Sequence, residues 1–160
     1  MRKYIILAAM FLLSGCSTWN SLTENWSWNA LNPWANDKEE AITADEAEPK
    51  VELPASVNKY LWQACLDKLS FMGIASQNPE EGRIATDWIS SSSAPNEKFK
   101  IVAEVDGGDL RADALHIKVY KEVNGKNGWI KTAPSASFEN EIEQAVIKRA
   151  KVLYISDKEQ

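Results

Sequence analysis

The chain has 160 residues, a length that suits one domain of about 100 residues with flanking segments and excludes a large multidomain protein. It has 18 basic and 23 acidic residues and a formal net charge of -5, so the sequence predicts no binding of nucleic acid. One histidine and two cysteines form no cluster with metal-ligand spacing.

Residues 1–15 have the pattern of a secretory signal peptide. Arg2 and Lys3 form a short positive region, and residues 4–13 form an apolar run. This run is much shorter than the ~20 residues that a membrane-spanning helix needs. We therefore expect residues 1–15 to be removed on secretion.

Leu13, Ser14, Gly15 and Cys16 close the apolar run. This tetrapeptide resembles the bacterial lipobox. The resemblance implies that Cys16 carries a covalent diacylglycerol and an N-acyl lipid, which would anchor the protein stably in a membrane. Ser17 stands where an Asp would resemble an inner-membrane retention signal, which implies the periplasmic leaflet of the outer membrane.

Residues 16–36 form a lipidated segment that is rich in tryptophan, with Trp19, Trp26, Trp28 and Trp34 and almost no charge. Such a segment cannot build a core, and tryptophan favours membrane and protein interfaces. The segment is therefore either a tether whose aromatic side chains contact the bilayer or a docking segment. In the second case Trp26, Trp28 and Trp34 are candidate partner contacts.

Residues 37–56 form an acidic linker. Residues 37–52 contain seven acidic residues against Lys38 and Lys50, whereas residues 57–160 carry 15 acidic and 14 basic residues. The acidity of the secreted chain is therefore concentrated in the linker. Its content of Glu, Ala and Pro predicts a solvated spacer that lets the domain reach away from the membrane.

Residues 57–160 are predicted to form one α+β domain. A first helix is expected from Val57 to Met72, because apolar residues recur at steps of three and four, and Gly73 ends it. Cys65 lies on its apolar side. We expect this cysteine to be a small buried hydrophobe, rather than a reactive thiol or an intermolecular bridge.

Three or four antiparallel strands follow, predicted from alternating hydrophobicity and turn residues. They are residues 82–90, 99–105, 115–119 and a short strand around 129–132. A loop is expected at residues 90–96 and a hairpin turn at 106–108. Asn-Gly pairs at 124–125 and 127–128 mark another turn.

A final helix is predicted after Pro134, with Ser135 or Ser137 as its cap. Acidic residues in its first turns and basic residues in its later turns match the helix dipole. Its buried stripe comprises Phe138, Ile142, Ala145, Val146, Val152 and Leu153. The sequence therefore predicts an antiparallel three- to four-stranded sheet with an N-terminal and a C-terminal helix on one face, a helix-grip-like arrangement.

Six runs of the domain carry a resemblance: residues 60–62, 66–67, 69–72, 86–88, 95–100 and 110–113. They resemble a family of uncharacterised bacterial envelope lipoproteins, best known from alphaproteobacteria, with a domain of unknown function. The resemblance covers residues 58–150 and names no reaction. More distantly, the layout is similar to that of the C lipoprotein of the outer-membrane β-barrel assembly machinery, which joins its lipid to helix-grip modules by a long segment that lies along a partner.

The sequence offers little chemistry. His116, the only histidine, alternates with Leu115 and Ile117 and is predicted to face solvent. We find no nucleophile with a matching base, no phosphate-binding loop and no acid pair with a telling spacing. We therefore expect no enzyme activity and no cofactor besides the lipid.

Asp87, Trp88, Arg111 and Asp113 are candidate contacts for a partner or ligand. Arg111 and Asp113 lie two residues apart on a predicted strand and so share a face, and Asp87 lies on another strand that could approach them. Two interpretations remain open: a salt bridge that fixes the strand register, or a binding surface.

These patterns predict a lipid-anchored, non-enzymatic envelope module that docks a periplasmic or outer-membrane protein through its sheet face, its tryptophan-rich segment or both. The alternative is a small-ligand or cell-wall binding lipoprotein that holds a lipid or glycan between helices and sheet. An accessory hydrolase, the third candidate, would need an acid pair or a Ser-His pair to converge in space. An apolar cavity would favour the alternative, whereas a packed core with exposed aromatic residues would favour docking.

Overall fold

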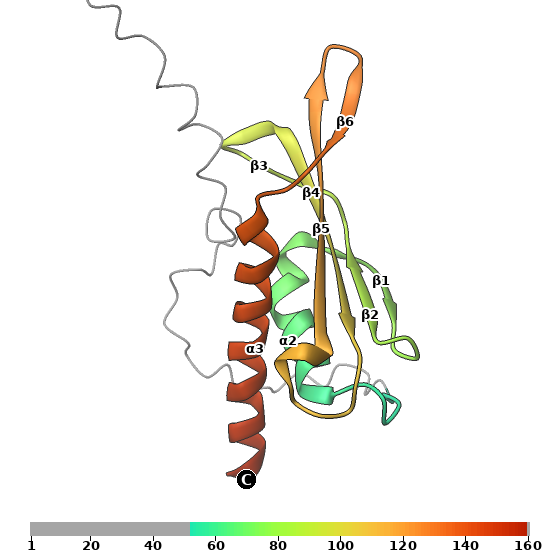
Figure 1. The fold of residues 1–160 in the computed structure, drawn as a ribbon, viewed down its shortest axis with the longest axis vertical. Coiled ribbons are helices and arrows are strands. Elements are labelled where there is room, and N and C mark those ends of the chain that lie inside the picture. The colour runs from blue at the N-terminus through green and yellow to red at the C-terminus, as the bar shows by residue number, and fades with distance from the viewer. Residues whose placement is uncertain (1–51, 160) are drawn as a thin grey trace, which may run out of the picture.

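The computed structural model describes residues 52–159 (Figure 1). The predicted signal peptide, the tryptophan-rich segment and most of the acidic linker lie outside the described residues, and so do Cys16, Trp26, Trp28 and Trp34. Within the described range, no helix combines the length and the apolar character needed to cross a membrane.

The first helix, α2 (Lys59–Leu69), begins two residues later than predicted. Asn58 is its N-cap, and the Asn58 Oδ1 atom accepts hydrogen bonds from the backbone N–H groups of Tyr60 and Leu61, both at 3.0 Å. A 3-10 turn, η2 (Ser70–Met72), continues the helix to Gly73. Gly73 ends it as predicted, since its φ of +77° lies in the region that favours glycine.

The domain is an α+β fold, as predicted, but its antiparallel sheet has six strands rather than three or four. The spatial order is β1-β2-β4-β5-β6, and β3 pairs with β4 beyond the end of β2. The strands are β1 (Ile74–Asn78), β2 (Arg83–Thr86), β3 (Ile89–Ser91), β4 (Ala94–Val105), β5 (Leu115–Gly125) and β6 (Gly128–Thr132).

Four details of the predicted sheet were wrong. The single strand expected at residues 82–90 is divided into β2 and β3. β1 was missed because it is a mostly exposed edge strand without alternating hydrophobicity. The loop expected at 90–96 is instead the hairpin between β3 and β4, in which Ser91 faces Ala94. The connection expected as a tight turn at 106–108 runs to residue 114 and contains a short 3-10 helix, η3 (Ala112–Ala114).

Both helices pack on one face of the sheet, as predicted (Figure 1). The second helix, α3 (Ala136–Lys158), lies beside α2 and along β5. Alternate residues of β4, including Phe99, Ile101 and Ala103, are buried under the helices. The buried core cluster, which includes Cys65, is drawn from Val57–Ala150. Residues 52–159, the part of the chain that the structure describes, therefore contain every residue of this core cluster.

Helix α3 protects a free edge of the sheet. β6 pairs only with the end of β5, which leaves the backbone N–H groups of Ile117 and Val119 without a strand partner. Glu139 Oε1 accepts a hydrogen bond from Val119 N at 3.0 Å, and Glu143 Oε1 accepts one from Ile117 N at 3.4 Å. These carboxylates accept the hydrogen bonds of backbone N–H groups at an edge that could otherwise pair with another chain.

The start of α3 differs in one detail from the prediction. Ser135 occupies the N-cap position, but its hydroxyl makes no capping hydrogen bond to the helix backbone. Its Oγ atom lies 3.1 Å from Ser137 Oγ instead.

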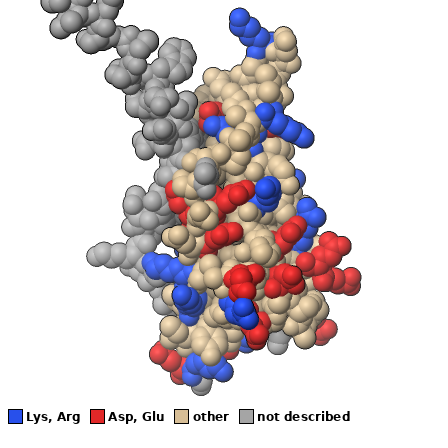
Figure 2. Space-filling model, viewed as in Figure 1, with Lys and Arg blue, Asp and Glu red and all other residues tan. Residues whose placement is uncertain are grey.

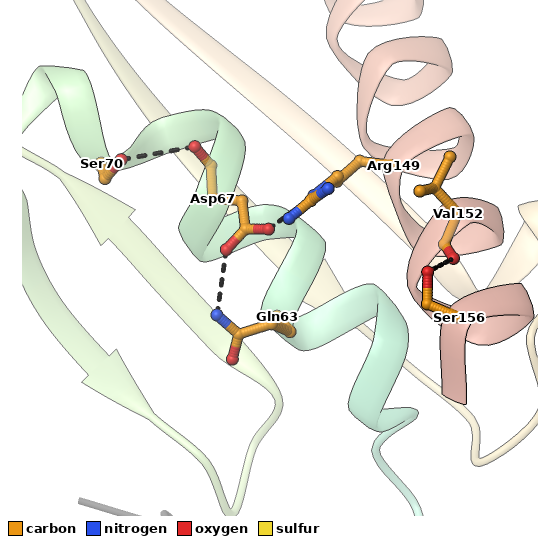
Figure 3. A network of polar contacts seen from close by, with 6 residues as sticks. All are labelled: Gln63, Asp67, Ser70, Arg149, Val152 and Ser156. Carbon is orange, nitrogen blue, oxygen red and sulfur yellow. Dashed lines mark hydrogen bonds and ion pairs between the residues drawn. The ribbon is translucent and has the colours of Figure 1, made fainter. Parts of the chain in front are cut away.

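A partly buried ion pair joins the two helices (Figure 3). Arg149 Nε donates to Asp67 Oδ2 at 2.6 Å, with the Arg and Asp side chains 17% and 23% exposed. Gln63 Nε2 donates to the other carboxylate oxygen of Asp67 at 3.0 Å. Because both oxygens of Asp67 have partners, the contact fixes α2 and α3 relative to each other.

Candidate functional site

The candidate site is the face of the sheet that points away from the helices, which we call the outer face. Cross-strand pairs such as Ile101 with Val119 are buried on the helix side, so the intervening pairs point the other way. These include Lys100 with Tyr120 and, on the neighbouring strands, Glu122 with Lys131. No helix of the described residues covers this face.

Three exposed aromatic side chains lie on the outer face: Trp88, Tyr120 and Trp129 are 40%, 44% and 43% exposed. Lys98 Nζ lies 4.8 Å from the ring centre of Trp88 and 4.5 Å from that of Trp129. The same ammonium group forms an ion pair with Glu122 at 2.9 Å. Cation–π contacts to one lysine therefore fix both indole rings at the surface.

Three further lysines surround Tyr120. Lys100 lies directly opposite on β4, Lys118 lies two residues earlier on β5, and Lys131 lies on β6 opposite Glu122. Among the described residues, no acidic side chain lies within ion-pair distance of these three ammonium groups. They are therefore available to an anionic group.

The outer face is positive although the domain is nearly neutral. By register, β2, β4, β5 and β6 place more basic than acidic side chains on it. The basic residues are Arg83, Lys98, Lys100, Lys118 and Lys131, and the acidic residues are Glu104 and Glu122. On the side seen in Figure 2, by contrast, both signs are interspersed, with acidic atoms more frequent in the lower half.

Two shallow hollows lie on the outer face of the sheet. The upper one, about 340 Å³, is lined by Trp88, Lys100, Tyr120 and Lys131, among others. The lower one, about 330 Å³, lies where the chain enters the domain and is lined by residues from the entering segment and the ends of strands. Its lining includes Ser56, Val57, Glu80, Glu81, Arg83, Glu104 and His116.

His116 is exposed on the outer face opposite Glu104, which confirms the predicted solvent-facing position. Within residues 52–159, no three His, Cys, Asp or Glu side chains form a group that could hold a metal ion. What the upper hollow offers is aromatic surface and ammonium groups. This chemistry suits the binding of anionic groups.

The structure separates the four residues that we grouped as candidate contacts. Arg111 and Asp113 form a salt bridge, with Nε–Oδ1 at 3.0 Å and Nη2–Oδ2 at 2.7 Å, and a salt bridge was one of the two interpretations left open. However, they lie in the β4–β5 connection and in η3 rather than on a strand, so they fix no strand register. The hydrogen bonds from Arg111 lower the pKa of Asp113. Both side chains are exposed.

Asp87 and Trp88 lie toward the opposite end of the sheet from this pair. Asp87 N donates to Gly73 O at 2.9 Å, and Trp88 contacts Lys98 near the start of β4. The Arg111 connection instead follows the other end of β4. Of the four grouped residues, only Trp88 therefore joins the aromatic cluster of the outer face.

Sequence analysis missed most of the outer face. Lys98, Lys100 and Tyr120 alternate with inward-facing positions, and Trp129 lies in a strand that is exposed throughout, so each one is typical of an ordinary solvent-facing strand residue. The cluster exists only because strands from different parts of the chain are in register. The one available signal was Trp129 within the mostly polar residues 124–132.

Comparison with known proteins places this fold in a family. The family described as "Domain of unknown function (DUF3576)" matches residues 55–155. The Uncharacterized protein RP420 of Rickettsia prowazekii (strain Madrid E) is 32% identical over 101 residues, which are 63% of this chain and 60% of that protein. The chain thus spans less than two thirds of that relative. The family match includes α2, all six strands and most of α3, and the chain belongs to the family of the domain of unknown function DUF3576.

Proposed function

We propose that this protein is a lipid-anchored, non-enzymatic module of the bacterial envelope that docks a protein partner through its outer face. The observation that supports this most is the set of three exposed aromatic rings beside Lys100, Lys118 and Lys131, which have no acidic partner within residues 52–159. Tryptophan and tyrosine are frequent anchors of protein interfaces. Because Lys98 already holds two of the rings, binding would cost little side-chain ordering.

The anchor is part of the same proposal. Residues 13–16 resemble the lipobox, so Cys16 would carry the lipid that attaches the protein to the periplasmic leaflet of the outer membrane. Trp26, Trp28 and Trp34 would add contacts to the bilayer or to the partner. The layout of lipid, long segment and domain is similar to that of the C lipoprotein of the β-barrel assembly machinery.

Core packing supports docking over the binding of a lipid or glycan between helices and sheet. Phe99 and Phe138 are each 1% exposed, and their rings meet edge to face at 5.4 Å. Leu61, Ile101 and Ile142, at 0%, are also part of this layer. A ligand placed there would have to displace well-packed side chains, at a cost of several kcal/mol.

Photocrosslinking in intact cells tests the proposal. The full chain would carry a photoreactive residue in place of Tyr120, at the centre of the outer face. We expect it to crosslink to a discrete envelope protein. The yield should fall about tenfold when Trp88→Ala and Trp129→Ala are added, equivalent to ~1.4 kcal/mol of lost binding.

The matched control carries the photoreactive residue in place of Lys151, which is exposed on α3. Equal crosslinking from both positions, or a yield that the Trp88 and Trp129 substitutions do not change, would contradict docking through the outer face. The anchor is checked separately with labelled palmitate. The wild-type chain should incorporate the label, and Cys16→Ser should not.

A further inference from the structure

The chain itself contains a segment whose charge is opposite to that of the outer face. We propose that the outer face binds the acidic segment 37–52 of the same chain, so that a partner must displace this segment to dock. This intrachain contact does not depend on the proposed partner or on lipidation. The segment that binds is part of this chain, and the surface that it binds lies within the described residues.

Charge complementarity is the first argument. Residues 37–52 hold seven acidic residues and two basic residues, and residues 41–49 contain no basic residue at all. On the outer face, Lys100, Lys118 and Lys131 lack an acidic partner among the described residues. The segment therefore carries several negative charges, and the outer face carries several positive charges that no described acidic residue neutralises.

The tether is the second argument. The segment ends at Glu52, the first described residue, and the chain enters the domain at Ser56 and Val57. These two residues line the lower hollow together with Arg83 and His116 and with the acidic residues Glu80, Glu81, Glu104 and Asp106, so the basic part of the outer face begins beyond this hollow. Figure 1 shows this entry at the lower end of the sheet, beside the β1–β2 turn. The segment is therefore joined to the chain at one end of the face that it would cover.

The reach of the segment suits the face. Glu52 lies fifteen residue steps after Asp37, and an extended chain of that length spans about 50 Å at ~3.3 Å per step. The outer face follows β4, whose 12 residues cover about 40 Å. A short tether gives an effective concentration on the order of 1 mM. Even weak binding would therefore keep the face largely occupied.

The environment of the rings argues against a membrane as the occupant. Rings that insert into a bilayer would have to project from the surface, whereas Trp88 and Trp129 have Lys98 over their rings and expose only 40% and 43% of their surface. An extended acidic segment needs no insertion. Its carboxylates can reach the lysines while its aliphatic carbons lie against the aromatic rings.

The natural tryptophans of the domain supply the assay. Residues 52–160, which contain the core cluster of the described residues, have three tryptophans: Trp62 is buried, and Trp88 and Trp129 lie on the outer face. A peptide of residues 37–52 contains no aromatic residue and is invisible in this assay. We expect a saturable change in tryptophan emission when the peptide is added, with an affinity that weakens at least about tenfold between ~0.05 M and ~0.5 M salt.

Three controls define the site. Lys118→Glu with Lys131→Glu should weaken peptide binding at least about tenfold. The same reversals at Lys151 and Lys158, on α3 across the sheet, should leave it unchanged. A peptide in which all seven acids are replaced by their amides should not bind.

The intrachain contact is tested by comparing residues 37–160 with residues 52–160. In the longer chain Trp88 and Trp129 should be less accessible to acrylamide, and added peptide should bind at least several-fold more weakly because the face is occupied. Equal quenching in both chains would overturn the proposal. So would binding of the amide peptide, self-association of residues 52–160 through this face, or binding to vesicles with anionic lipid but not to the peptide.

Discussion

Burial decides the chemistry of Cys65. Its side chain is 0% exposed within the core, and burial raises its pKa to about 12. We predict that iodoacetamide leaves the folded domain unmodified at pH 8 and alkylates it in urea, because only a thiolate that is accessible to the reagent reacts. Alkylation is followed by mass spectrometry. Alkylation of the folded protein as fast as that of the unfolded chain would contradict this prediction.

The same pKa shift has a consequence for stability against pH. The thiol keeps its proton more tightly in the folded state, since its pKa rises from 9.0 to about 12. The contribution of the buried thiol to the free energy of unfolding is therefore complete below pH 9 and declines as the pH rises from 9 toward 12. Cys65→Ala should remove this part of the alkaline loss of stability, as followed by urea unfolding at several pH values.

Single residues were predicted well where local pattern decides their environment. Burial of Cys65, exposure of His116 and the alternation of Phe99 with Lys100 follow from the periodicity of one element. Pairing of Arg111 with Asp113 was also expected. Its place in a connection was not, because the sequence does not show that the turn after Val105 extends over nine residues.

At the level of elements, the Asp67–Arg149 pair should contribute measurably to packing of α2 on α3. Both side chains are less than a quarter exposed, so removing one leaves a charge that water solvates poorly. We predict that Arg149→Met lowers the free energy of unfolding by about 1–3 kcal/mol. Urea unfolding followed by circular dichroism measures this.

Two further variants separate the ion pair from general effects of charge. Asp67→Leu combined with Arg149→Met should cost less than the sum of the single changes, because neither charge is then left alone. Arg111→Ala, which breaks the exposed pair with Asp113, should leave the free energy of unfolding close to that of the wild type. Fully additive effects at Asp67 and Arg149 would show that the two residues do not interact.

Elements with a strong amphipathic pattern were predicted, and so was the exposed edge strand β6, which follows two Asn-Gly pairs, whereas β1 and β3 were not predicted as separate strands. Both helices and the central strands β4 and β5 bury one face, so apolar residues recur with the period of their structure. β1 and β3 are short and have little buried surface. β1 pairs with β2 and β3 pairs with β4. The hydrophobic pattern of β1 or β3 alone does not predict this pairing.

The outer face is a property of the whole molecule. Trp88, Lys98, Tyr120 and Lys131 come from four separate segments, and only the completed sheet brings them together. In the sequence these residues stand at separate positions, and nothing there predicts that they lie together. The acidic linker, in contrast, was evident from the sequence, because its charges are consecutive.

The unpaired lysines of the outer face should reduce the stability of the domain. Lys100 and Lys118 flank Tyr120 with no acidic partner among the described residues, and like charges on neighbouring strands repel. We predict that Lys118→Glu raises the free energy of unfolding of residues 52–160 by a few tenths of a kcal/mol at low salt, and that ~0.5 M salt removes the gain. The same change at Lys151 on α3 is the control. A loss of more than about 1 kcal/mol in Lys118→Glu would instead mean that this lysine supports the fold, because a charge kept for binding is expected to cost stability rather than provide it.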